Sequence, residues 1–227
     1  MSNIVTTTET GFFDMSFEYQ PNPHAIEQDS FRQIRQLTDL SGLSDDAQQV
    51  VMRVVHSVGD PLVAQQMRVS ANACAAGRDA LANHNNILVD VEMVKQGITK
   101  RMIKNLPLCY LNHEDTATIA KQRGETRSMA ALDLWGDQLA GSVVVIGNAP
   151  TALFRLLEMI KAGSPKPALI VGIPVGFVGA AESKQTLWDI HEELGIECIT
   201  LLGRQGGSAA ASSVVNALLR CNIDERY

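Results

Sequence analysis

The sequence has few cysteines, and the four that it has lie far apart. Cys74, Cys109, Cys198 and Cys221 form no CxxC pair and show no Cys/His spacing of a zinc site. Reduced thiols in a cytosolic protein are therefore the simplest interpretation. We expect no metal site built from these residues.

Long hydrophobic runs are also missing. The longest uncharged apolar run, from Pro167 to Ala181, contains Pro174 and several glycines and is too short to span a bilayer. The first residues show no basic region followed by an apolar one, which argues against a signal peptide. We therefore expect a cytoplasmic protein with no membrane partner.

Clusters of basic charge are absent as well. The formal net charge is −6, and the lysines and arginines are scattered singly. Such a pattern gives no electrostatic footprint for nucleic acid or for an anionic membrane surface. Both partners are excluded from the expected functions.

Aromatic residues are scarce, and they are unevenly placed. Four of the eleven, Phe12, Phe13, Phe17 and Tyr19, lie near the start of the chain. This density favours residues 1–23 as an N-terminal extension or arm that docks on its own subunit or on a partner subunit. A loose tail explains the composition equally well.

What the sequence does contain is a regular alternation of strand-like and helix-like segments. Of its 227 residues, 45% are hydrophobic, enough for a substantial core. Short β-branched or apolar runs at 87–91, 108–111, 142–146, 168–172 and 198–202 are each followed by helical spacing. This rhythm predicts an α/β fold, a three-layer, doubly wound, flavodoxin-like parallel sheet of about five strands.

The segment before residue 85 is mostly helical in pattern. It predicts helices over 25–40, 45–58 and 71–82, the second with Ser44 as N-cap and with Gly59 and Pro61 at its end. No low-complexity linker separates these helices from the strands. We expect an N-terminal helical layer packed on the sheet, one domain over 24–221 and a C-terminal tail over 222–227.

Three glycine-containing turns follow predicted strands. They are "GNAPT" at 147–151, "GIPVGFVG" at 172–179 and "GRQGGS" at 203–208. Ligands of open parallel sheets bind at this edge, and free N–H groups at a helix start attract anions. The candidate binding residues here are Gly147, Asn148, Ala149, Gly207 and Ser208. Glycines needed only for turn geometry are the alternative.

The usual nucleotide motifs do not fit these turns. None carries the Lys-Ser/Thr pair of a P-loop, and "GIPVGFVG" has the wrong glycine spacing for GxGxxG. No acidic residue is suitably placed to bind a ribose. A nucleotide-binding protein is therefore the weakest of the functions considered.

A further anion-binding candidate is "GETRSMAALDLW" at 124–135. Arg127 and Ser128 fall in the first turn of a predicted helix, where a cation is unfavourable unless an anion joins it. Arg127 is thus a candidate clamp for a carboxylate, and the alternative is a surface arginine paired with Glu125. Thr99, in "GITK", is a weaker candidate.

The segment "VVMRVVHSVGD" at 50–60 has two faces when drawn as a helix. Its valines form one stripe, and Arg53, His56 and Asp60 lie on the other side. His56 can donate or accept a proton near neutral pH, with Arg53 to hold an anion and Asp60 to orient the ring. A solvated helix face explains the same pattern.

Several segments together resemble the precorrin-8X methylmutases of cobalamin biosynthesis. From about His24 to Leu219 they are, in order, "HAIEQDSFRQIRQLTD", "VVMRVVHSVGD", "ILVDVEMVKQGI", "GETRSMAALDLW", "LAGSVVVIGNAPTALFRLLEMI", "PKPALIVGIPVGFVGAAESK" and "GRQGGSAAA". The most specific are "IGNAPTALF" and "PVGFVGAAESK". Residues 24–221 would then form a single methylmutase domain.

The resemblance implies an isomerase that moves a methyl group between adjacent ring C carbons of precorrin-8X or cobalt-precorrin-8, giving hydrogenobyrinate or cobyrinate. It implies that His56 is the proton donor and acceptor, that Ser30 and Arg53 bind substrate, and that no cofactor is required. It also implies a flavodoxin-like homodimer that binds the macrocycle near the subunit interface. A non-catalytic corrinoid-binding or carrier protein is the alternative. The sequence does not indicate whether the substrate contains cobalt.

Overall fold

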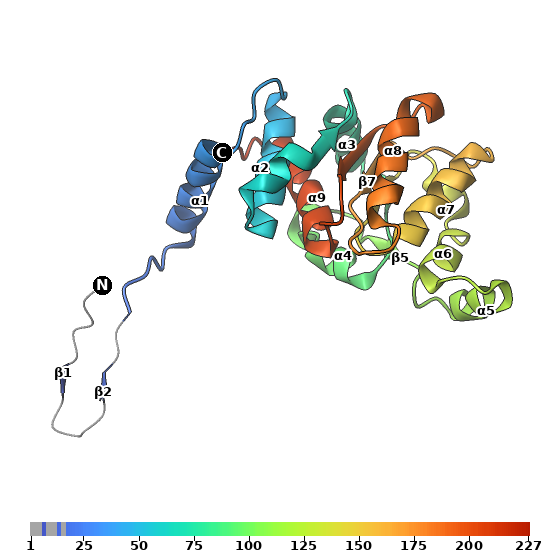
Figure 1. Ribbon diagram of the computed structural model, residues 1–227, viewed down its shortest axis with the longest axis horizontal. Helices are drawn as coiled ribbons and strands as arrows, with labels where there is room; N and C mark the ends of the chain where they lie inside the picture. Colours follow the sequence, from blue (N-terminus) through green and yellow to red (C-terminus); the bar gives the residue numbers. More distant parts are fainter. Residues whose placement is uncertain (1–5, 8–12, 15–16) are drawn as a thin grey trace.

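The computed structural model describes residues 6–7, 13–14 and 17–227 (Figure 1). Strands β1 (Thr6–Thr7) and β2 (Phe13–Asp14) pair antiparallel before the main body of the chain. Phe17 and Tyr19 are 75% and 78% exposed, so these two aromatic side chains are not docked on their own chain. Phe12 lies outside the described residues, and an arm that docks on a partner stays a prediction.

The main sheet has six strands in the order β3-β8-β7-β6-β4-β5. The five expected strands are all present and pair parallel; they are β4 (Ile87–Val89), β5 (Leu108–Cys109), β6 (Val143–Ile146), β7 (Leu169–Gly172) and β8 (Cys198–Leu201). The expected parallel sheet of about five strands is therefore only part of a mixed, six-stranded sheet. A sixth strand, β3 (Met67–Val69), pairs antiparallel with β8 at the edge.

Helices cover both faces of this sheet. Besides α1 (Pro23–Leu37), α2 (Asp45–Val58) and α3 (Ala73–Ala82), they are α4 (Glu92–Gly97), α5 (Glu114–Arg123), α6 (Arg127–Leu132), α7 (Pro150–Lys161), α8 (Ala180–Leu194) and α9 (Ser208–Asn222). Three short 3₁₀ helices connect them, η1 (Pro61–Gln66), η2 (Lys100–Met102) and η3 (Gly136–Leu139).

The strands alternate between two cores, as expected for a sheet buried on both sides. Val143 and Val145 of β6 pack with residues of α2, α3 and α9, whereas Val144 and Ile146 pack with residues of α7 and α8. Both sets are fully buried. The three expected layers are therefore present.

Of the three N-terminal helices, α3 lies on the sheet, whereas α2 and α1 are stacked outward from it. α3 contacts β6 and β7, but α2 packs on α9, and α1 packs on α2. Figure 1 shows α1 at the outer end of the molecule. The expected N-terminal layer is therefore only partly correct: α9, with eleven buried residues, lies between α2 and the sheet, where it contacts β6 and β7.

Local signals explain where α1 and α2 begin and end. Asn22 caps α1 by accepting hydrogen bonds from the N–H groups of His24 and Ala25, so α1 starts at Pro23, two residues before the expected position. Ser44 caps α2 as expected. Gly59 ends α2 with φ of 74°, a left-handed conformation that favours glycine.

Within the described residues, no helix combines the length and the apolar character needed to cross a membrane. The four cysteines are free, and three of them are buried.

Candidate active site

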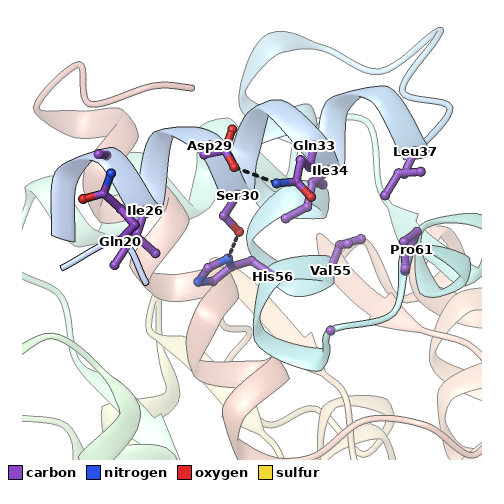
Figure 2. Close-up of a pocket in the computed structure, with 12 residues that line it drawn as sticks. Gln20, Ile26, Asp29, Ser30, Gln33, Ile34, Leu37, Val55, His56 and Pro61 are labelled. Atoms are coloured by element: carbon purple, nitrogen blue, oxygen red, sulfur yellow. Dashed lines mark hydrogen bonds between the residues drawn. The ribbon is translucent and has the colours of Figure 1, made fainter. Parts of the chain in front are cut away.

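A hollow of about 610 Å³ lies between α1 and the C-terminal end of α2 (Figure 2). Its walls combine apolar side chains with a small polar group; they include Ile26, Ile34, Leu37, Val55, Pro61, Ser30, Asp29, Gln33 and His56. A mostly apolar concave surface with a few polar groups is typical of a site for an organic ligand.

His56 is the titratable ring at this hollow. The Ser30 hydroxyl lies 2.9 Å from Nδ1 of His56, and Phe31 stacks on the ring with centroids 5.2 Å apart. When Ser30 donates to Nδ1, the ring proton lies on Nε2; when Nδ1–H donates to Ser30, Nε2 is a free base. The contact can therefore serve either direction of proton transfer.

The expected role of Asp60 is wrong. Its carboxylate accepts a hydrogen bond of 2.9 Å from the N–H of Leu62 and caps η1. Across residues 17–227, no hydrogen bond joins Asp60 to His56. The sequence placed Asp60 on the helix face of His56, but α2 ends at Gly59 and the chain turns there.

The environment of His56 favours its neutral form. Partial burial and the positive charge of Arg53 lower the pKa of His56 below its usual value, and the carboxylate of Glu27 opposes them. At neutral pH the ring is therefore mostly uncharged and able to accept a proton, and proton donation starts from the protonated fraction.

Arg53 is held by an internal carboxylate and by two aromatic rings. Its Nη1 donates to Oε1 of Glu27 at 3.1 Å, and its guanidinium lies 4.5 Å from the ring centre of Phe31 and 5.3 Å from that of Tyr227. The Arg53 side chain is 12% exposed. In this chain the acid that Arg53 binds is Glu27, and its capture of a substrate carboxylate stays a prediction.

A second, smaller groove of about 320 Å³ lies on the other side of His56. Arg53, His56 and Thr99 all line it, so three expected site residues do meet here. The remaining lining is rich in small polar side chains, namely Ser57, Ser212, Ser213 and Asn216. Thr99 is held at the groove through its N–H, which donates to Asn216 at 2.8 Å.

The "GNAPT" turn is not a free anion receptor, contrary to expectation. The N–H groups of Gly147, Asn148 and Ala149 all donate to the carboxylate of Asp90, each at 2.9 Å. Asp90 is 0% exposed. The turn does bind a carboxylate, but this carboxylate belongs to the protein.

Sequence reasoning missed Asp90, although a signal was present. It is a charged residue directly after the apolar run of β4, and β4 lies beside β6. Because parallel strands end at one edge, Asp90 meets the turn that follows β6. Burial raises the pKa of Asp90, and the three N–H donors work in the opposite direction.

The "GRQGGS" turn is also partly engaged. The N–H of Gly207 donates to the carbonyl of Ile173 at 2.9 Å. A Cβ on Gly206 would come within 2.6 Å of the carbonyl oxygens of Ile173 and Pro174, so only glycine fits there. Ser208, the first residue of α9, is buried, and its neighbour Ala209 reaches the smaller groove.

Lys184 is hydrogen-bonded to this turn. The side chain is fully buried, and Nζ donates to the carbonyl of Gln205 at 2.5 Å. Burial lowers the pKa of Lys184 to about 8. Sequence reasoning did not single out Lys184, although it ends the quoted segment "PVGFVGAAESK".

Arg127 and Ser128 are not brought to His56 within one chain. They begin α6, which lies at the opposite end of the molecule from α1 and α2 (Figure 1). Arg127 is exposed, whereas Ser128 is buried. The surface pairing considered for Arg127 is wrong, because Glu125 pairs with Arg155 and Arg123 instead.

Comparison with known proteins gives one consistent family. A family model described as precorrin-8X methylmutase matches residues 25–221. A precorrin-8X methylmutase of Pseudomonas aeruginosa is 48% identical over 203 residues, which cover 88% of this chain and 97% of the relative. A cobalt-precorrin-8 methylmutase of Methanocaldococcus jannaschii is 38% identical over 177 residues, 78% of this chain and 80% of the relative.

A solved structure agrees with these matches. The precorrin-8X methyl mutase of Thermus thermophilus superposes with a TM-score of 0.79 at 33% identity, covering 89% of this chain and 100% of that one. The similarity therefore extends over the whole domain and is not limited to the motifs.

Proposed function

The chain belongs to the precorrin-8X methylmutase family, and we propose that it moves a methyl group between adjacent ring C carbons of a corrinoid precursor with His56 as its acid/base group. It is an isomerase of cobalamin biosynthesis. The product is hydrogenobyrinate from precorrin-8X, or cobyrinate from the cobalt-containing precursor.

One observation carries the assignment to His56, its hydrogen bond with Ser30 at the wall of the 610 Å³ hollow. Because α1 supplies Ser30 and α2 supplies His56, the hydroxyl fixes the ring orientation across a helix–helix contact. The Nε2 atom is then left for the substrate. No other histidine lines either of the two cavities at the α1–α2 end of the described chain.

The reaction needs one proton, delivered and then recovered. Nε2 of His56 gives a proton to the conjugated macrocycle, which makes the ring an electron sink. The bond between the methyl group and its original ring carbon breaks, the methyl group carries that electron pair to the neighbouring carbon and forms the new carbon–carbon bond there, and the positive charge passes to the carbon that it left. Return of the proton to His56 restores conjugation, so atoms and charge balance without a second catalyst.

The acidic side arms of the macrocycle require positive partners. Arg53 and Thr99, which both line the smaller groove, are placed to bind one side arm beside His56. The first N–H groups of α9, at Ser208 and Ala209, supply a second set of hydrogen-bond donors for a carboxylate there. The N–H groups of the "GNAPT" turn are bonded to Asp90, so only the exposed side chain of Asn148 is proposed as a substrate contact from this turn.

A homodimer explains the placement of Arg127 and Ser128. Neither can reach His56 of its own chain, since α6 and α2 lie at opposite ends of the molecule (Figure 1). We propose that the partner's α6 contributes these residues to the site. The exposed apolar side chains of Phe177 and Val178, on the loop after β7, favour a partner surface in the same region of the sheet edge.

The proposal extends to the domain and the fold. Residues 24–221 would form one methylmutase domain in the cytoplasm. Taken alone, the five parallel strands run in the order 2-1-3-4-5, the flavodoxin-like order, and β3 is an added antiparallel edge strand.

The decisive experiment is incubation of the protein with the metal-free and the cobalt-containing precursor in parallel, followed by absorption spectra. A time-dependent spectral change to the rearranged product supports the isomerase. The precursor that is converted faster shows whether the preferred substrate contains cobalt. Immediate binding spectra that then stay constant with both precursors would contradict turnover and favour a non-catalytic corrinoid carrier.

A further inference from the structure

A partly buried cluster of charged and aromatic groups lies beside His56, with the ring of Phe31 between His56 and Tyr227. Its members come from three parts of the chain: Glu27 and Phe31 from α1, Arg53 from α2, and Arg220 and Tyr227 from the end of α9 and the segment after it. Tyr227 lies beyond the residues matched by the family model. Of these residues, the proposed function assigns a role only to Arg53, which binds a side arm of the substrate.

Glu27 is the centre of the cluster. Its Oε1 accepts from Arg53 at 3.1 Å and lies 3.7 Å from Nη2 of Arg220, and the nearby Tyr227 hydroxyl lowers the pKa of the same carboxylate. Partial burial alone would raise the pKa of Glu27, but the hydrogen bonds from Tyr227 and Arg53 and the charge of Arg220 lower it. Glu27 is therefore ionised at neutral pH.

The aromatic rings fix this geometry. Phe31 stacks on Tyr227 with centroids 4.2 Å apart and an interplanar angle of 14°, and its ring also stacks on His56. The Tyr227 backbone is tied to α2, because its N–H donates to Gln49 at 3.0 Å and its carbonyl accepts from Gln49 at 2.8 Å. The ring and hydroxyl of Tyr227 are thus held against Phe31 and Glu27.

We propose that Glu27 is a positioning residue whose carboxylate, held by Tyr227 and Arg220, fixes the Arg53 guanidinium beside His56 and balances its positive charge. The inference rests on the proposed role of His56. Without Glu27, Arg53 would stand beside the ring with an unopposed charge, and protonation of His56 would be disfavoured.

The charged groups around His56 come from every element packed near it. They are Glu27 and Asp29 on α1, Arg53 on α2, Asp60 after α2, and Arg220 on α9. Of these, Arg53 and Glu27 are the two whose charges act on the pKa of His56, and they act in opposite directions. The opposing effects of Glu27 and Arg53 on the pKa of His56 can therefore be tested with the two single variants and the double variant.

The test is a nuclear magnetic resonance titration of His56 in four proteins: parent, Glu27→Gln, Arg53→Gln and the double variant. The His56 signal is assigned with His56→Asn. We expect the pKa of His56 to fall in Glu27→Gln, to rise in Arg53→Gln and to return toward the parent value in the double variant. An unchanged pKa in both single variants, or a shift of the same sign in both, would overturn the proposal.

Two further proteins guard against trivial explanations. Asp39→Asn removes the charge of an exposed carboxylate that accepts a hydrogen bond from the N–H of Ser41. This variant is expected to leave the pKa of His56 unchanged. Tyr227→Phe keeps the ring that stacks on Phe31 and removes only the hydroxyl, so it tests the cluster even where Glu27→Gln fails to fold. A smaller shift in the direction of Glu27→Gln is expected, and no shift would exclude Tyr227 from the positioning role.

The titration is independent of turnover. When His56 shifts as expected but no protein rearranges either precursor, the proposed function fails and the positioning role stands. When the parent turns over substrate but the His56 titration is the same in all variants, the positioning role fails alone.

Discussion

The hydroxyl of Ser30 lies 2.9 Å from Nδ1 of His56, and this contact joins the outermost helix of the protein to the helix that carries the proposed acid/base group. Helix α1 packs on α2, and it is also tied to the body through Tyr227 and through the Glu27–Arg220 ion pair with α9. The orientation of the His56 ring therefore depends on how α1 packs.

Replacing His56 with alanine is expected to remove the proton donor while leaving the binding groups in place. General acid–base groups typically contribute about 10²–10⁴-fold to the rate, so turnover should fall by about that factor while corrinoid affinity stays within about threefold. Single-turnover absorption spectra and equilibrium binding measure the two quantities. A variant that rearranges substrate at near the parent rate would show that His56 is not the acid/base group.

The pH dependence of the reaction should follow His56. Burial and Arg53 lower the pKa of His56 below 6.5, and proton delivery to the macrocycle requires the protonated ring. Hence kcat/KM should fall as the pH rises through a value below 6.5, and Glu27→Gln should move that limb to lower pH. A profile that is flat from pH 5 to 8 would be inconsistent with this assignment.

Asp90→Asn should destabilise the sheet edge. The amide offers one acceptor oxygen and turns an NH₂ group toward N–H donors of the turn after β6, which leaves buried donors unpaired. Since hydrogen bonds to a charged group contribute about 1.5–3 kcal/mol each, a loss of about 2–3 kcal/mol in the free energy of unfolding is expected. Urea unfolding measures it.

Asp39→Asn is the matched control for this change, because it removes the same charge from an exposed position. It should leave the unfolding midpoint close to that of the parent. Equal effects of the two substitutions would mean that the buried Asp90 contacts do not stabilise the turn.

Subunit mixing tests whether Arg127 acts in the partner's site. His56→Ala and Arg127→Ala are each expected to be weakly active at low substrate, because one lacks the acid and the other lacks a side-arm contact. In a 1:1 mixture with random exchange, about a quarter of the parent activity should return, since half of the dimers would each contain one intact site. No recovery, despite exchange shown by mass spectrometry, would place both residues in a site within one chain.

Lys184 should make stability depend on pH in the alkaline range. Its pKa is lowered by burial from 10.5 to about 8, so the unfolded chain binds more protons than the folded one between these values. Stability from this group therefore rises with pH from about 8 to 10.5. The difference in unfolding free energy between the parent and Lys184→Met isolates it, because other groups titrate alike in both proteins. A pH-independent difference would contradict the lowered pKa.

The sequence by itself determined the elements and their faces. The valine stripe of 50–58, the cap at Ser44 and the stop at Gly59 place α2 correctly, because these signals act within a few residues of one another. The same holds for the five apolar runs that become parallel strands. The family resemblance rests on ordered motifs along the chain, and the comparisons confirmed it. A three-residue edge strand such as β3 has no such pattern, so it was missed.

Only the tertiary structure decided what those faces meet. Asp90 accepts hydrogen bonds from the turn that the sequence suggested as a ligand site, and Glu27 accepts one from Arg53. Folding brings together these carboxylates and donors, which lie 57 and 26 residues apart. Asp60 loses its expected role to Ser30, since α1 packs back on α2. Short-range patterns fix where a side chain points along its own helix, whereas its partner depends on packing between segments distant in sequence, and that packing exists only in the folded chain.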